Sequence, residues 1–65
     1  MTPGFYFFNI KMGHQNNITI SRETKREAEY AFSTYLNQGK DCEWLGKWDG
    51  KKFVDNTYVA PPANA

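Results

Sequence analysis

A run of four aromatic residues, Phe5 to Phe8, stands near the start of a chain of only 65 residues. A chain this short buries only about 60% of the surface that its unfolded form exposes, so its core needs a large apolar area per residue. Because Cys42 is the only cysteine, no internal disulfide can add stability. Aromatic residues make up 17% of the sequence, and each ring buries a large area. We therefore expect residues 1–59 to form a single domain around a core built from rings.

The first third of the chain predicts a hairpin. Residues 5–12 and 17–20 are rich in aromatic and β-branched residues, and a polar connector that begins with Gly13 joins them. His14 lies in this connector, where we expect it to be a solvated turn residue. Both faces of the first strand carry rings, because alternation places Tyr6, Phe8, Ile10 and Met12 on one face and Phe5, Phe7, Asn9 and Lys11 on the other.

Residues 22–38 predict an amphipathic helix. Ser21 is a natural N-cap, and Thr24 with Glu27 offers an alternative capping box one turn later. Gly39 supplies the left-handed residue with which many helices end. The apolar residues recur at the spacing of one helical stripe, which comprises Ala28, Ala31, Phe32, Tyr35 and Leu36.

Residues 42–55 predict a second hairpin. The Asp-Gly pair at 49–50 lies between two apolar segments and favours a two-residue turn. In the resulting register Trp44, Trp48 and Phe53 share one face of the hairpin. A three-residue loop would shift the register and mix the two faces.

The order strand, strand, helix, strand, strand (ββαββ) predicts an α+β fold. Its simplest arrangement is a four-stranded antiparallel sheet with one helix packed on one face. The first strand is the most apolar, so we expect it in the middle of the sheet. The tail 60–65, Ala-Pro-Pro-Ala-Asn-Ala, cannot form regular structure, and we expect it to be disordered.

The sequence contains no group of residues with the spacing of a catalytic site. His14 is the only histidine, and no partner for acid–base chemistry stands out near it. Asp41 and Glu43 flank Cys42, and neighbouring carboxylates raise the pKa of a thiol, which disfavours a nucleophile. One cysteine and one histidine also fall short of the usual ligands of a zinc site. We therefore expect no enzyme, no metal and no cofactor.

The predicted sheet has more rings than one helix can cover. A sheet with a helix on one side needs only one apolar face, whereas the first strand and the second hairpin carry apolar residues on both faces. Three arrangements remain open for the second face. It is shielded by the tail through Tyr58 and Val59, buried in a homodimer, or exposed to a partner.

Basic residues accompany these rings and define a candidate partner-binding surface. One group surrounds the last turn, and another forms a column on the exposed side of the predicted helix at i, i+4 and i+8. The candidate residues are Lys47, Trp48, Lys51 and Lys52 at the turn, and Arg22, Arg26 and Tyr30 on the helix.

The segment 44–55, WLGKWDGKKFVD, follows an amphipathic helix and an N-terminal hairpin. In its pattern of Trp-Leu, a basic-Asp-Gly turn and Lys-basic-aromatic-Val-Asp, it resembles the end of small phage-encoded anti-CRISPR proteins that act on type I-F surveillance complexes. The resemblance implies an inhibitor that docks on the repeated backbone subunit of the complex and obstructs the path of the target DNA. It implies Lys51 and Lys52 as contact residues, with Lys47 nearby.

The first expected function is therefore that of a small phage or mobile-element protein that inhibits a CRISPR-Cas-like host defence complex. Its partner is then a protein, in a nucleoprotein complex such as a CRISPR surveillance complex. The alternative is a small nucleic-acid-binding module whose sheet rings stack unpaired bases beside basic residues. A net charge of +1 argues against a protein held mainly by the phosphate backbone, so nucleic acid is the secondary partner. The third alternative is a structural homodimer, and the choice between monomer and homodimer stays open.

Two features bear on where the chain works. A solitary thiol suits a reducing compartment. No segment approaches the roughly 20 apolar residues of a membrane span. We therefore expect a cytoplasmic protein, in the bacterial host that the resemblance implies, with no membrane partner.

Overall fold

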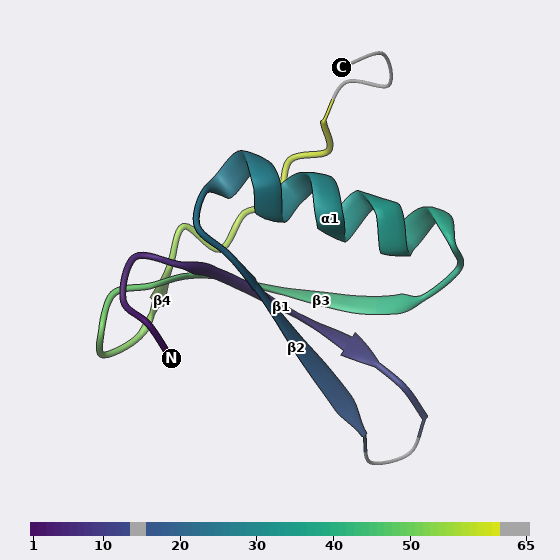
Figure 1. Ribbon diagram of the computed structural model, residues 1–65, viewed down its shortest axis with the longest axis horizontal. Coiled ribbons are helices and arrows are strands. Elements are labelled where there is room, and N and C mark those ends of the chain that lie inside the picture. Colours follow the sequence, from purple (N-terminus) through teal and green to yellow (C-terminus); the bar gives the residue numbers. More distant parts are fainter. Residues whose placement is uncertain (14–15, 62–65) are drawn as a thin grey trace.

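The structure is a computed structural model that describes residues 1–13 and 16–61. Its helix lies across one side of an antiparallel four-stranded sheet, which confirms the expected α+β fold (Figure 1). His14 and residues 62–65 lie outside the described residues. The predictions for the loop histidine and for most of the tail therefore stay predictions. The elements in chain order are β1 (Tyr6–Lys11), β2 (Asn17–Arg22), α1 (Lys25–Asn37), β3 (Asp41–Trp48) and β4 (Phe53–Val54).

The strand order β2-β1-β3-β4 places β1 in the interior of the sheet, as predicted. Phe8 is fully buried and Ile10 is 3% exposed, and both pack against α1 together with Phe32. The Phe8 and Phe32 rings meet edge to face, with their centroids 5.2 Å apart. The even-numbered residues of β1 therefore face the helix, in agreement with the predicted alternation.

The helix begins after the later of the two predicted N-caps. Thr24 is the N-cap, and its Oγ1 accepts a hydrogen bond of 3.1 Å from the N–H of Glu27. The start at residue 22 with Ser21 as the cap is wrong, because Ser21 and Arg22 pair with β1 and extend β2. The predicted stop is confirmed in position, since Gly39 follows the helix with a φ of 81°.

A β-bulge interrupts the pairing of β3 with β1. Phe7 lies opposite Gly46 and Phe8 lies opposite Trp44, so Leu45 is an extra residue on β3. An extra residue shifts the alternation of side chains along the strand. Two residues that lie on either side of the bulge, and that would share a face in a regular strand, therefore point to opposite faces of the sheet.

The bulge separates the two tryptophans. The Trp44 ring lies 5.5 Å from the Phe32 ring of α1, whereas the Trp48 ring lies 5.0 Å from Phe53 on the other side of the sheet. The prediction that Trp44 shares a face with Trp48 and Phe53 is therefore wrong. Its error is the assumption of unbroken alternation in β3.

A four-residue loop, 49–52, joins β3 to β4, because Trp48 lies directly opposite Phe53. The predicted two-residue turn at 49–50 is therefore wrong. Asp49 Oδ1 accepts hydrogen bonds from the N–H groups of Lys51 and Lys52, each 2.8 Å long. The N–H of Asp49 in turn donates to the Lys52 carbonyl oxygen at 3.1 Å. These local bonds close the wider loop.

After β4 the chain returns to the helix side of the sheet. The Tyr58 ring lies 4.5 Å from Phe32 and 5.6 Å from Trp44. Tyr58 therefore completes the core beneath α1. The alternative in which Tyr58 and Val59 shield the second face of the sheet is wrong, because the first of these residues packs on the opposite side and the N–H of Val59 donates to Glu29 of α1 at 3.1 Å.

Candidate binding surface

Three rings from three strands gather on the face of the sheet that α1 leaves uncovered. Phe7 points to this face because Phe8, the next residue of β1, points to the helix. Its ring lies 6.1 Å from Phe53, and Phe53 lies 5.0 Å from Trp48, both in edge-to-face geometry. We call Phe7, Trp48 and Phe53 the ring cluster. Phe7 is only 6% exposed, so Trp48 and Phe53, both half-buried, form its accessible part.

The far end of the uncovered face is polar. Asn9 pairs with Thr19 of β2 and Glu43 of β3, and Thr19 Oγ1 donates to Asn9 Oδ1 at 2.7 Å. Lys11 follows at the end of β1 and is exposed. The apolar area on this face is therefore confined to the end of the sheet where β3 turns into β4.

The loop 49–52 places two lysines next to the ring cluster. Lys51 and Lys52 are exposed, and they directly precede Phe53. Hydrogen bonds from the backbone N–H groups of Lys52 and Lys51 hold the pKa of the Asp49 carboxyl below its usual range. The Asp49 carboxylate therefore fixes the backbone of the loop that carries both exposed lysines.

The structure brings together only part of the predicted surface. Trp48 ends β3, and Lys51 and Lys52 lie in the loop that follows it. Lys47 lies opposite Tyr6 in the register, so its side chain leaves the sheet on the helix side, away from Trp48. Lys47 is also half-buried, whereas Lys51 and Lys52 are exposed.

The predicted helix column does not exist. Arg22 belongs to β2 and is paired with Tyr6, because the strand continues where a helical turn was expected. Arg26 and Tyr30 remain four residues apart on the exposed side of α1, and Tyr30 is 55% exposed. They lie on the helix side of the sheet and do not adjoin the ring cluster.

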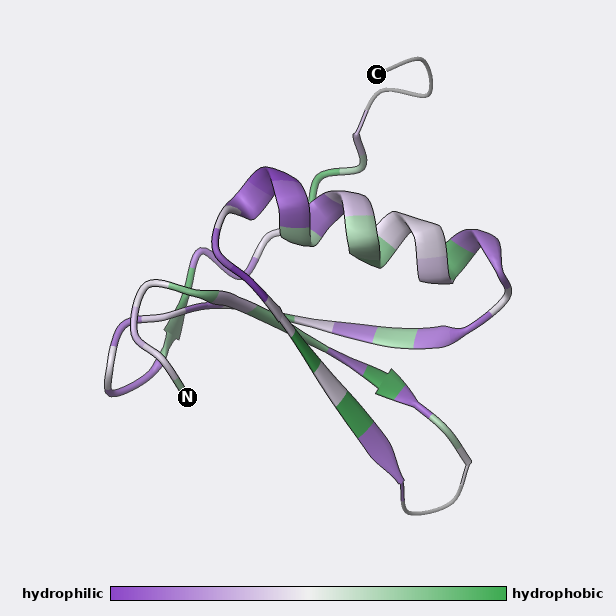
Figure 2. Ribbon diagram, in the orientation of Figure 1, coloured by the Kyte–Doolittle hydropathy of each residue, from purple (hydrophilic) through white to green (hydrophobic). Residues whose placement is uncertain are grey.

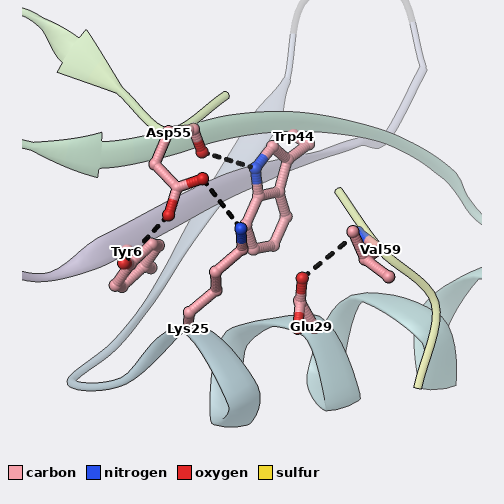
Figure 3. Close-up of polar contacts among 6 residues, drawn as sticks. All are labelled: Tyr6, Lys25, Glu29, Trp44, Asp55 and Val59. Carbon is pink, nitrogen blue, oxygen red and sulfur yellow. Dashed lines mark hydrogen bonds and ion pairs between the residues drawn. The ribbon is translucent and has the colours of Figure 1, made fainter. Parts of the chain in front are cut away.

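A polar cluster around Asp55 was missed by sequence reasoning (Figure 3). Asp55 Oδ1 accepts from Lys25 Nζ at 2.7 Å and Oδ2 accepts from the Tyr6 hydroxyl at 3.2 Å. The Asp55 carbonyl oxygen accepts from Trp44 Nε1 at 3.4 Å. Asp55 also has a φ of 52°, which is uncommon outside glycine and best tolerated by Asn and Asp. No sequence signal marks the cluster, because its members come from distant segments.

The electrostatics of this cluster indicate a structural role. The hydrogen bond with Lys25 holds the pKa of the Asp55 carboxyl below its usual range, and the same bond raises the pKa of Lys25. Burial, followed by the hydrogen bond to Asp55, raises the pKa of the Tyr6 hydroxyl. Each group is thus stabilised in the protonation state it already has at neutral pH. Such a set holds the chain after β4 in place and is poorly suited to proton transfer.

Two observations concern the other titratable groups of residues 1–13 and 16–61. Within these ranges no three His, Cys, Asp or Glu side chains come together as metal ligands do. Burial, and then Asp41, raises the pKa of the Cys42 thiol, which lowers its thiolate fraction. In the same part of the chain, no helix has the length and apolar character needed to cross a membrane.

Comparison of the chain with protein families, with curated proteins and with solved structures finds no match. The ring cluster and the neighbouring loop are therefore the features of the chain from which a function can be inferred.

Proposed function

We propose that this chain is a small, non-catalytic protein of phage or mobile-element origin that inhibits a host defence complex of the CRISPR type. It binds the complex and obstructs its nucleic-acid path. One observation carries the proposal. The loop 49–52, which has two lysines and is held by hydrogen bonds to Asp49, lies next to the half-buried rings of Trp48 and Phe53.

The rings and the lysines have complementary tasks in such a contact. Aromatic side chains at the centre of an interface contribute most of the affinity when they become fully buried. Trp48 and Phe53 are already held against each other by cross-strand pairing, so little conformational entropy is lost when they bind. Lys51 and Lys52 next to them favour an acidic or nucleic-acid-lined surface and speed the encounter.

The likeness of segment 44–55 to type I-F anti-CRISPR proteins supports the choice of partner. The lysines that the likeness implies as contacts, Lys51 and Lys52, are exposed side chains of the loop. Lys47 is not part of the proposed contact, because it lies on the helix side. The proposed surface thus consists of Trp48, Lys51, Lys52 and Phe53.

Titration of the chain into a purified type I-F surveillance complex tests this function. We expect the chain to co-purify with the complex and to reduce its binding of target DNA in a concentration-dependent way. A complex that binds target DNA equally well with and without the chain would rule the proposal out.

The ring cluster favours a second candidate, a module for single-stranded nucleic acid. Stacking on an aromatic side chain contributes about 1–3 kcal/mol per base, which gives useful affinity without a strongly basic surface. Trp48 and Phe53 lie on an uncovered sheet face beside two lysines, as such a module requires.

Tryptophan fluorescence separates the second candidate from the first. A Trp44→Phe variant leaves Trp48 as the only reporter, and its emission is measured while single-stranded oligonucleotides are added at low salt. Quenching that disappears at high salt is expected of the module. Unchanged emission would eliminate it and leave the inhibitor.

A further inference from the structure

The strand β2 forms one edge of the sheet, and no strand of the described residues pairs with its outer side. At the end of this edge the Arg22 guanidinium donates to the Ser21 carbonyl oxygen at 2.7 Å. The N–H of Met12 donates to the Asn16 carbonyl oxygen at 2.8 Å, which sets the phase of the hydrogen bonds between β1 and β2. The register of this pair is unbroken from Lys11–Asn17 onward. Because hydrogen-bonded and non-hydrogen-bonded pairs alternate, the even residues of β2 bond to β1. The N–H and C=O groups of Asn17, Thr19 and Ser21 therefore point outward.

Residues 17–21 of this edge lack the devices with which proteins usually prevent strand addition, and the only charged residue of β2, Arg22, stands at its last position. Charged side chains, proline and bulges are the common ones. Residues 17–21, Asn-Ile-Thr-Ile-Ser, contain neither a charge nor a proline, and their pairing with β1 has no bulge. Figure 2 shows hydrophobic and less hydrophobic positions alternating along β2. Ile18 is 46% exposed, although it lies on the helix side of the sheet.

The segment is close to a palindrome centred on Thr19. Two isoleucines flank Thr19, and two small polar residues, Asn17 and Ser21, flank the isoleucines. A twofold symmetric interface places the same patch of both copies in contact, so it requires this kind of self-complementarity. An unrelated strand would need no symmetry in β2.

We propose that two copies of the chain pair antiparallel through β2, with the twofold axis at Thr19. In this register Thr19 lies opposite the same residue of the second copy, and Ile18 lies opposite Ile20. The outward groups of residues 17, 19 and 21 then bond across the axis, and Arg22 releases the Ser21 carbonyl oxygen that it binds in the single chain. The isoleucines meet in the non-hydrogen-bonded pairs, where side chains are closest. The two sheets become one continuous sheet with both helices on the same side.

The ring cluster stays free in this dimer, because it lies at the β3–β4 end of the sheet and β2 is the opposite edge. Figure 1 shows β2 diverging from α1, so the helix does not cover the edge. A standard interface buries about 1,200–2,000 Å² of total surface, and a contact between two edge strands buries less. We therefore expect a reversible dimer with a Kd in the micromolar range. The dimer is independent of the proposed inhibition.

Charge at the twofold axis tests the pairing. In Thr19→Lys and Thr19→Glu, like charges lie directly opposite each other across the axis, which destabilises a cross-strand pair. We expect the wild type to sediment at twice the 7.5 kDa of one chain, each variant alone at one chain, and their equimolar mixture again as a dimer. Thr57→Lys, an exposed change away from the edge, should leave the dimer intact.

Amide hydrogen exchange of the wild type provides a second readout that needs no variant. The Thr19 N–H should be protected at high protein concentration and exchange rapidly on dilution, whereas the Ile20 N–H, bonded to β1, stays protected throughout. Rapid exchange of the Thr19 N–H at all concentrations would overturn the proposal. A wild type that sediments as one chain up to about 1 mM would also overturn it, and so would a Thr19→Lys variant that dimerises as well as the wild type.

Discussion

Gly46 has no side chain, and this allows the backbone of residues 54–56 to pass close to it. Its φ is 109°, and a Cβ at this position would lie 2.5 Å from the Val54 carbonyl oxygen. Gly39 also has a positive φ, 81°, but a Cβ there would meet nothing within 4 Å. An alanine at Gly39 therefore has only the cost of the left-handed backbone, whereas an alanine at Gly46 has this cost and a steric clash.

We predict that Gly46→Ala destabilises the protein clearly more than Gly39→Ala does. The strain of a left-handed residue alone costs about 1–3 kcal/mol, and at Gly46 the contact with β4 adds to it. Urea unfolding of both variants measures the difference. Equal losses of unfolding free energy would show that β4 does not pack against Gly46.

Asp55 makes the stability depend on pH. Its pKa is lowered chiefly by the hydrogen bond with Lys25, so its contribution is fully present above the ordinary carboxyl pKa and is lost as the pH falls through the lowered value. We predict that Asp55→Asn lowers the Tm at pH 7 and that its Tm approaches that of the wild type below about pH 4. Asn tolerates the positive φ, which keeps the backbone unchanged. A Tm difference that stays constant from neutral to acidic pH would contradict this account.

The start of α1 is set by Thr24 and not by Ser21. We predict that Thr24→Ala destabilises the protein by about 1 kcal/mol through loss of the N-cap. Ser21→Ala, within β2, should change the unfolding free energy by less than about 0.5 kcal/mol. Chemical denaturation measures both. The reverse order of effects would mean that the helix begins at residue 22.

Much of the order of elements could be predicted from the sequence, because it depends on local signals. The alternation in β1, the apolar stripe of α1 and the stop at Gly39 each act within one element. The bulge at Leu45 and the extension of β2 to Arg22 could not be predicted, since they are decided by pairing with the central strand. Local propensity was overridden there by contacts distant in sequence.

The candidate surface shows the same division. Trp48, Lys51 and Lys52 are neighbours in the chain, so their proximity followed from the hairpin alone. The prediction for Lys47 assumes a two-residue turn, and that for Arg22 assumes a helix that begins at residue 22. The structure has neither feature. The Asp55 cluster depends on contacts between residues far apart in the sequence.

At the scale of the whole molecule, the two sides of the sheet differ in their side chains. On the helix side, α1 and Tyr58 pack against the sheet and form a core that consists largely of aromatic rings. The uncovered side has the ring cluster at one end and polar residues at the other. The uncovered side therefore presents one small apolar area beside two exposed cations, and the proposed binding to a charged partner depends on this end of the sheet.

Charge reversal measures most directly whether this end of the sheet is the working surface. Lys51→Glu/Lys52→Glu changes the loop, and Lys11→Glu/Lys40→Glu makes the same change in net charge at the other end of the sheet, where both lysines are exposed. The measurement is the affinity of each double variant for the surveillance complex by titration calorimetry. We predict that the loop variant binds more than about tenfold more weakly and the control changes by less than about twofold. Equal affinities of the two double variants, or full binding by the loop variant, would contradict the account.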